Sequence, residues 1–460
     1  MKTLVSVAEK PVLKDEYMRD VAAMGKMQNR GTTPKIHRAW LVAAVTAMAL
    51  IATAAFRSTT GAFFAPLENE FSWDRTGLSA AVMINLAIYG LVAPFAATLI
   101  ERFSMRKVAI GALLLVSTGA GLAVLITELW HLWLLWGGLV GLGTGAMALV
   151  FGAAVANRWF TKHRGLVMGL FSGANAAGQL VFLPSIVFII EATEWRVASL
   201  TVAACALLVI PLLIWPFSNS PQEAKTTPFG ATLTEEAPAP VNFKPTQGAI
   251  AATLSSLIRA MRYPAFWVLA MTFWVCGWST NGLIQTHFIP AAHDHGMPAT
   301  TASGLLALIG IFDIIGTMAS GWLTDRVRPW ILLAVYYALR GMSLLTLHTL
   351  LGPDIQPMMW IFIIFYGLDW VATVPPTVAL CNQYFGPQQA TVIFGWVFAF
   401  HMIGAGTGAL TAGLFRDMSG SYLVAWIVAA VLCFAAAISL IFLPRMRRSH
   451  MHTPLVDTAA

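Results

Sequence analysis

Apolar residues occupy most of this chain in long, uninterrupted runs that alternate with short polar stretches. A helix needs about 20 consecutive apolar residues to cross the hydrocarbon core of a bilayer, and these runs are long enough. The strands of an outer-membrane barrel would instead alternate over segments of about 10 residues. We therefore predict an all-α membrane protein with twelve transmembrane helices, at approximately 38–66, 77–100, 107–126, 131–157, 165–190, 196–217, 263–291, 299–322, 329–350, 357–384, 389–415 and 421–444.

One long polar stretch, about 218–255, interrupts the series after the sixth span. It is rich in Pro, Thr, Glu and Ala, a composition that suits a flexible linker. The predicted organisation is a cytoplasmic N-terminal tail, an N-terminal six-helix bundle, a cytoplasmic linker, a C-terminal six-helix bundle and a cytoplasmic C-terminal tail, at 1–37, 38–217, 218–262, 263–444 and 445–460.

Short sequences recur in the two halves at a nearly constant offset. Leu99-Ile100-Glu101-Arg102 matches Leu323-Thr324-Asp325-Arg326, and Asn157-Arg158-Trp159-Phe160 matches Asn382-Gln383-Tyr384-Phe385, at offsets of 224 and 225 residues. The chain is thus two six-helix pseudo-repeats. This is the plan of transporters that hold their substrate between two halves near the middle of the bilayer.

Composition excludes several other classes of protein. Only 11% of the residues are charged and 58% are apolar, whereas soluble domains carry about 25% charged residues. Lys and Arg gather in alternate loops and both tails, which predicts cytoplasmic termini and the inner (cytoplasmic) membrane of a bacterium. The net charge of +7 therefore reflects topology and indicates no nucleic-acid partner. Without a Walker loop, zinc signature or nucleophile elbow, we expect no enzymatic activity, cofactor or metal.

Two loop sequences carry a family resemblance. Gly321-Trp322-Leu323-Thr324-Asp325-Arg326-Val327-Arg328 resembles the loop motif of the major facilitator superfamily, and Glu101-Arg102-Phe103-Ser104-Met105-Arg106-Lys107 resembles a degenerate copy of it. The resemblance covers nearly the whole chain and implies the major facilitator fold. Such acid–arginine clusters can latch helices through charge-assisted hydrogen bonds that break as the halves rock. The expected conformational gate is therefore Glu101, Arg102, Arg106, Asp325 and Arg326.

Within the superfamily, the stretches 57–67 and 70–73 resemble monocarboxylate porters and oxalate:formate-type antiporters, as do 164–169 and 417–422. The resemblance implies a small organic anion as substrate. It also implies a basic residue on helix 1 at Arg57, an acid on helix 8 that takes part in proton coupling at Asp313, and a basic residue on helix 11 at His401. The family's usual Arg one turn after the acid is Thr317 here.

Charged residues inside the spans need a reason, because each costs about 2.5–3.5 kcal/mol at a helix centre on insertion scales. Asp313, Arg340 and Asp369 are candidates for proton coupling; alternatively, Arg340 forms a structural ion pair with Asp369 or Asp313. Arg57 is the candidate ligand of the anion, since a guanidinium matches a carboxylate in shape and charge. The alternatives for Arg57 are exposure at the interface or pairing with Glu68.

Uncharged polar groups and one histidine complete the predicted substrate site. They are Tyr89 on helix 2, Asn175 on helix 5, Asn281 and Gln285 on helix 7, and His401 on helix 11. Each can bind a carboxylate or hydroxyl, and each can equally serve as a hydrogen-bonding group between helices.

These observations predict a secondary active transporter that moves a small organic anion, with a monocarboxylate favoured, by alternating access. Proton-coupled symport and anion exchange both remain open, so the expected partners are the anion, protons or a counter-anion, and the lipid bilayer. A monomer is sufficient for this mechanism. The alternatives are a proton-driven exporter of drugs or siderophore-like metabolites, and a transporter-like sensor that binds ligand but moves little.

Overall fold

The computed structural model describes residues 37–147, 149–231 and 249–446. Within these ranges the chain is almost entirely helical and forms no strand; a single isolated bridge joins Phe160 and Phe229. The prediction of an all-α fold is confirmed.

The helices before the polar stretch follow the predicted spans closely. They are α2 (Arg38–Thr59), η1 (Thr60–Phe63), α3 (Phe64–Phe71), α4 (Arg75–Val92), η2 (Ala93–Phe95), α5 (Ala96–Phe103), α6 (Met105–Leu122), η3 (Ala123–Leu125), α7 (Leu129–Leu132), η4 (Trp133–Val140), α8 (Gly141–Ala146), α9 (Leu149–Trp159), α10 (Arg164–Ala192) and α11 (Trp195–Ile214).

The helices after it repeat this pattern, preceded by one short helix that we did not predict. They are α12 (Ala249–Ala260), α13 (Pro264–Gly277), η5 (Trp278–Ile284), α14 (Gln285–Asp294), α15 (Ala299–Thr324), α16 (Pro329–Leu350), α17 (Pro357–Asp369), α18 (Val374–Phe385), α19 (Pro387–Ser419), α20 (Leu423–Phe442) and η6 (Leu443–Arg445).

Ten helical segments of the described ranges are long and apolar enough to cross a membrane. The predicted spans 165–190 and 263–291 are not among these ten. Of α10, only the apolar stretch Val181–Ala192 is found. The helix α13–η5–α14 is continuous, but its middle holds Ser279, Thr280, Asn281 and Gln285, which lower its hydropathy.

Large apolar side chains cover the outside of the bundle, as a lipid-facing surface requires. Trp215, Leu208 and Met318 are each more than 70% exposed. Buried apolar residues form two clusters, one mainly from the helices before the polar stretch and one mainly from those after it. We call residues 37–231 the N-half and residues 249–446 the C-half.

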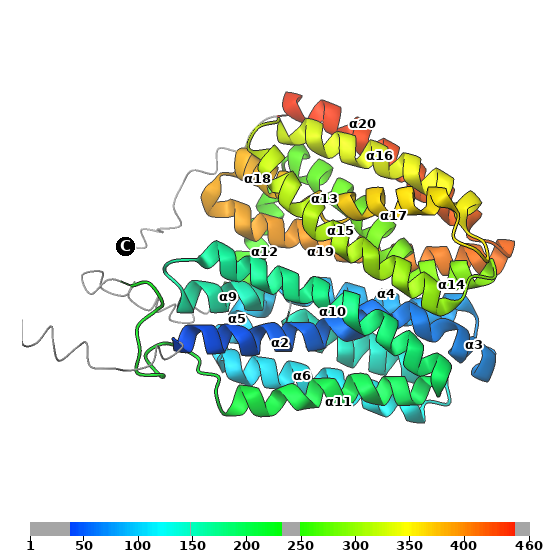
Figure 1. Ribbon diagram of the computed structural model, residues 1–460. Helices are drawn as coiled ribbons and strands as arrows, with labels where there is room; N and C mark the ends of the chain where they lie inside the picture. Colours follow the sequence, from blue (N-terminus) through cyan, green and yellow to red (C-terminus); the bar gives the residue numbers. More distant parts are fainter. Residues whose placement is uncertain (1–36, 148, 232–248, 447–460) are drawn as a thin grey trace, which may run out of the picture.

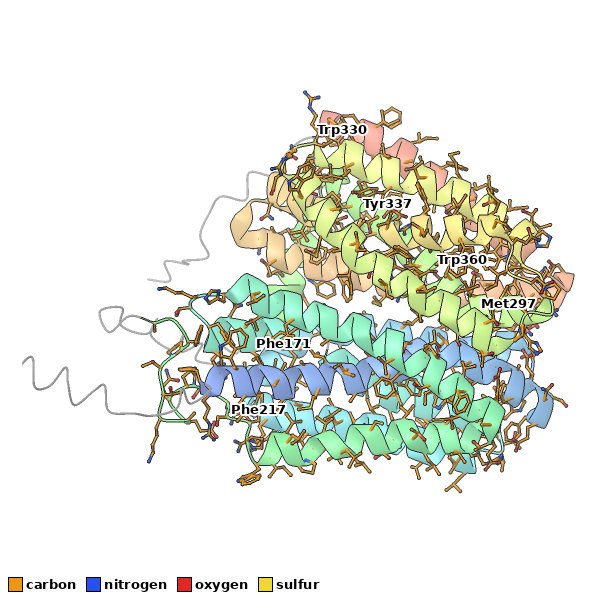
Figure 2. All side chains as sticks on the ribbon, in the orientation of Figure 1. Phe171, Phe217, Met297, Trp330, Tyr337 and Trp360 are labelled. Carbon is orange, nitrogen blue, oxygen red and sulfur yellow. The ribbon has the colours of Figure 1, made fainter. Side chains whose placement is uncertain are left out.

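The two halves lie side by side with their helices roughly parallel, and the segment that follows α11 lies at the same end as α12 (Figure 1). We call this the linker end and the opposite one the distal end. Figure 2 shows Phe217 and Trp330 toward the linker end and Met297 at the distal end. The ribbons of the halves meet at the distal end and diverge toward the linker end (Figure 1).

The first part of the polar stretch packs against the N-half, which differs from the flexible linker we expected. Phe229 donates its backbone N–H to the carbonyl of Trp159 at 2.8 Å, and its ring lies 5.7 Å from that of Trp40. Arg106 binds Glu223 at 3.3 Å. The average composition of this stretch is polar, so it did not predict the apolar contacts that the aromatic ring of Phe229 makes with the N-half.

Candidate substrate site

Arg57 lies near the end of α2, where its guanidinium covers an aromatic ring of the neighbouring helix. Its Cζ atom is 4.6 Å from the centroid of Tyr89 on α4. Tyr89 is buried, and Arg57 is half-buried. A cation over the face of an aromatic ring is stabilised by the ring's quadrupole. The structure thus brings together the first two residues of the predicted site.

The ring of Tyr89 continues this contact into the C-half. Phe398 on α19 lies 6.1 Å from Tyr89, and the ring of His401 stacks on Phe398 at 5.9 Å with an interplanar angle of 13°. Arg57, Tyr89 and His401 are therefore joined by a row of rings that crosses from one half to the other.

His401 is buried and held at both ring nitrogens. Nδ1 lies 3.0 Å from the carbonyl oxygen of Phe273, and Nε2 lies 3.2 Å from Oδ1 of Asn281. These two contacts, one to a backbone carbonyl and one to a side-chain amide, fix the orientation of the imidazole ring. The amide of Asn281 offers both a donor and an acceptor for hydrogen bonds.

Asn281 lies in η5, a π-helical stretch within the seventh span. Such stretches are uncommon and often occur at functional sites. At Gly277, just before it, an added Cβ would overlap the carbonyl oxygen of His401, so a glycine is needed for this close helix contact. Gln285 follows η5 and donates to the carbonyl of Ser58, beside Arg57, at 3.3 Å.

Five of the six predicted substrate residues thus fall on four helices that meet at the boundary of the halves. The sixth, Asn175, lies outside the residues whose side chains the structure describes. The arrangement offers a guanidinium group, an imidazole ring and amide groups. These are the groups that bind a carboxylate through charge-assisted hydrogen bonds.

The proton-coupling candidates gather at a break in the tenth span. The helix stops at Asp369 and resumes at Val374, because Pro375 and Pro376 lack the N–H groups needed to continue it. Pro376 leaves the carbonyl of Ala372 without its helical donor, and Ser320 on α15 donates to that oxygen at 2.5 Å.

Arg340 and Asp369 form a buried ion pair at this break. Arg340 Nε binds Asp369 Oδ2 at 2.5 Å, and Nη2 donates to the carbonyls of Asp369 and Trp370 at 2.7 and 3.2 Å. Nη1 contacts Cys276 Sγ at 3.1 Å. Of the two partners we considered for Arg340, the geometry gives Asp369. Oδ1 of Asp369 is buried and makes no hydrogen bond within the described residues.

Asp313 lies on α15 at the same break but accepts different hydrogen bonds. Its Oδ1 receives the backbone N–H of Val371 at 2.9 Å and the hydroxyl of Thr317 at 3.0 Å. The family resemblance implied an Arg at the position of Thr317, as the partner of the acid. Here the hydroxyl of Thr317 donates a hydrogen bond to Asp313 in its place. A carboxylate on α15 thus holds the backbone of the broken helix.

The ion pairs between the halves are at the distal end. Arg75, at the start of α4, binds both oxygens of Asp294 in the C-half at 2.8 and 2.9 Å and also binds Glu68 at 2.6 Å. Its Nη1 also donates to Tyr422 at 2.9 Å. Arg416 completes the cluster through Asp294 at 2.7 Å. Nearby, Thr76 donates its backbone N–H to Asp417 at 2.7 Å. The contacts of Arg75 with Asp294 and Tyr422, and of Thr76 with Asp417, join the two halves at the distal end.

The gate that we predicted shows no such contact. Arg106 pairs with Glu223 of the same half, Arg102 lies 5.5 Å from the ring of Phe103, and Arg326 lies 4.1 Å from the ring of Trp322. Neither Asp325 nor these arginines form an ion pair across the halves in the described part of the chain. The side chain of Glu101 lies outside that part.

A pocket of about 310 Å³ lies between the halves near the distal end. It contains none of the predicted substrate residues; its apolar lining includes Ala62, Pro66, Val187, Ile190 and Pro290. No group of three or more His, Cys, Asp or Glu that could hold a metal ion occurs among the described residues.

Sequence comparison finds relatives along nearly the whole chain. The MFS-type transporter YcxA of Bacillus subtilis (strain 168) is 26% identical over 442 residues, which cover 92% of this chain and 99% of that protein. Monocarboxylate transporter 12 of Homo sapiens is 24% identical over 466 residues, covering 93% and 87%. The predicted resemblance to monocarboxylate porters is confirmed.

The fold also matches solved structures. The crystal structure of a D-xylose-proton symporter superposes with a TM-score of 0.67 at 14% identity, over 89% of this chain and 98% of the other. The sequence profile of the Major Facilitator Superfamily matches residues 46–409. The chain therefore belongs to the Major Facilitator Superfamily and is a multi-pass membrane transporter, not an enzyme.

Proposed function

We propose that this transporter moves a small monocarboxylate, whose carboxylate binds Arg57 and whose remaining polar groups bind Gln285, Asn281 and His401. The observation that carries the proposal is the row of contacts from Arg57 through Tyr89 and Phe398 to His401, which crosses the boundary between the halves. A carboxylate bound there touches both halves, so its binding can be linked to their movement. The similarity to monocarboxylate transporter 12 supports the same substrate class.

We further propose that the linker end faces the cytoplasm of a bacterium, with both termini on that side. The basic loops 102–107, 158–164 and 326–328 lie at this end, as the positive-inside rule requires. The ion pairs at the distal end would then close the outer side, and breaking Arg75–Asp294 would accompany opening to the outside.

Proton coupling would use the break in the tenth span. A proton on Asp313 would weaken its hydrogen bond to the N–H of Val371, since a neutral carboxyl is a poorer acceptor than a carboxylate. Arg340 and Asp369 would keep the rest of the break in place. With Asp313 as the proton site, the transporter carries the anion together with a proton. A protein that still binds the anion but no longer couples its movement to the proton would instead exchange one anion for another.

The test replaces Arg57 in purified protein reconstituted into liposomes. Arg57→Gln should reduce the initial rate of labelled monocarboxylate uptake by at least 100-fold, because one charge-assisted hydrogen bond is worth about 1.5–3 kcal/mol and the guanidinium can form two. Arg57→Lys should retain part of the rate. Arg196→Gln is the control, since Arg196 pairs with Glu70 at the distal end within the N-half. Near-normal uptake by Arg57→Gln would exclude the site.

A further inference from the structure

The short helix α12 presents an apolar face away from the protein. Leu254 and Ile258 on α12, and Met261 in the turn directly after it, follow one another at helical spacing and are 41%, 57% and 39% exposed. The opposite face is buried, with Ser256 and Ala260 packed inward. The spacing i, i+4, i+7 places the three apolar side chains in one stripe. A stripe of this kind is costly in water and is typical of helices that lie in the membrane interface.

Two arginines with no acidic neighbour in the sequence accompany this stripe. Arg262 is exposed, and Nε of Arg259 is buried without a hydrogen-bond partner among the described residues. No Asp or Glu occurs between residues 249 and 293. The exposed Trp267 caps the end of the segment by donating Nε1–H to the carbonyl of Met261 at 2.8 Å, and Trp is enriched at membrane interfaces.

The position of α12 also puts it beside the boundary of the halves. Trp396 on α19 donates Nε1–H to the carbonyl of Thr253 at 3.1 Å, and its ring lies 6.0 Å from that of Phe95 in the N-half. Figure 1 shows α12 toward the linker end, where it packs against α19. A ligand on the outer face of α12 would therefore be connected by Trp396 to both halves.

We propose that α12 is a binding site for an anionic phospholipid, which would contact Arg259 and Arg262 through its headgroup phosphate and the stripe Leu254, Ile258 and Met261 through its acyl chains. The guanidinium groups of Arg259 and Arg262, which form no ion pair within the described residues, match the headgroup of such a lipid, and the exposed apolar stripe matches its acyl chains. The proposal does not depend on which substrate is transported.

Thermal unfolding of the full chain in detergent tests the proposal, because a ligand that binds the folded state raises the apparent Tm. Dioctanoyl phosphatidylglycerol should raise Tm by several degrees more than dioctanoyl phosphatidylcholine. Arg259→Gln combined with Arg262→Gln should abolish this difference, whereas the double substitution to Lys should keep most of it. Arg328→Gln, which removes an exposed charge at the same end, is the control and should keep all of it.

Three results would overturn the proposal. Equal shifts with both lipids would show that the headgroup charge is not recognised. A phosphatidylglycerol effect that survives in the double Gln variant would place the lipid elsewhere. A shift of the same size with glycerol 1-phosphate would indicate a simple anion site that does not use the apolar stripe. If the double Gln variant does not fold, loss of the shift in Arg262→Glu alone, with retention in Arg262→Lys, decides the same question.

Discussion

The substitution Asp294→Asn should open the distal end, because this carboxylate holds the ion pair that joins the halves. Arg75 and Asp294 have side chains only 9% and 16% exposed, and two bonds of 2.8 and 2.9 Å connect them. Breaking a fully buried pair costs about 3–5 kcal/mol, and an exposed pair contributes about 0–1 kcal/mol. Glu68 remains on Arg75 after the substitution, so we expect an intermediate loss of about 2 kcal/mol. This corresponds to a shift of about 30-fold toward the distal-open state.

Pulsed electron paramagnetic resonance, which measures the distance between spin labels on the two halves, reports this shift. Suitable positions are the exposed Glu128 and Asp354, replaced by Cys in a Cys205→Ser background because the other three cysteines are buried. The Asp294→Asn variant should move most of the distance distribution to a longer value. Arg196→Gln is the matched control: it breaks an ion pair at the same end, but within one half and with side chains 31% and 37% exposed. An unchanged distribution for Asp294→Asn, or an equal shift in the control, would refute the reasoning.

The effect of Asp294→Asn should also persist at acidic pH. Asp294 lies just beyond the predicted seventh span. Burial raises the pKa of this carboxyl, but hydrogen bonds from Arg416 and Arg75 outweigh burial and hold the pKa below its ordinary value of 3.8. A carboxyl with a lowered pKa contributes its ion pairs above that ordinary value and loses them only as the pH falls through the lower one. The difference between wild type and variant should therefore be as large at pH 5 as at pH 8, and a difference that disappears at pH 5 would contradict it.

Two further substitutions address the break in the tenth span. Arg340→Met leaves Asp369 buried without its cation and should cost about 3–5 kcal/mol of stability, seen as a lower Tm in detergent. Adding Asp369→Leu should recover part of this loss, and a Tm unaffected by Arg340→Met would contradict a structural role. Asp313→Asn keeps an acceptor for the N–H of Val371 but cannot titrate. It should leave exchange of labelled substrate intact and abolish accumulation driven by a proton gradient; unchanged accumulation would exclude Asp313 as the proton site.

Much of the fold could be predicted because a bilayer imposes a length and a composition on every helix that crosses it. Local signals also mark where helices begin and end: Asp74 caps the start of α4 by accepting the N–H of Gly77, and Gly420 ends α19 with a positive φ. Packing of the polar stretch could not be predicted from composition, because it depends on where single residues such as Phe229 meet the helices. The same holds for α12, whose apolar stripe is too short to stand out as a span.

The candidate site was predictable in its residue types and less so in its pairings. A charge inside an apolar run is conspicuous, so Arg57, Asp313, Arg340 and Asp369 could be selected from the sequence. Which partner Arg340 takes depends on the break at Pro375 and Pro376, which turns the carbonyls of Asp369 and Trp370 toward the guanidinium. The sequence did not predict the distal ion pair because Arg75 lies at the end of a helix. A charge there costs little free energy in a membrane, so it does not stand out from the other charges of the loops. Arg75's neighbours Asp294, Arg416 and Tyr422 are more than 200 residues away along the chain.

Uptake by proteoliposomes tests the central claim most directly. Purified protein would be offered a panel of labelled short-chain monocarboxylates and dicarboxylates, with and without an inward proton gradient, and with Arg57→Gln in parallel. The account predicts that a monocarboxylate accumulates when the gradient is present and that Arg57→Gln abolishes its uptake. If no member of the panel is transported under either condition, or if Arg57→Gln transports normally, the substrate class and the site proposed for it are wrong.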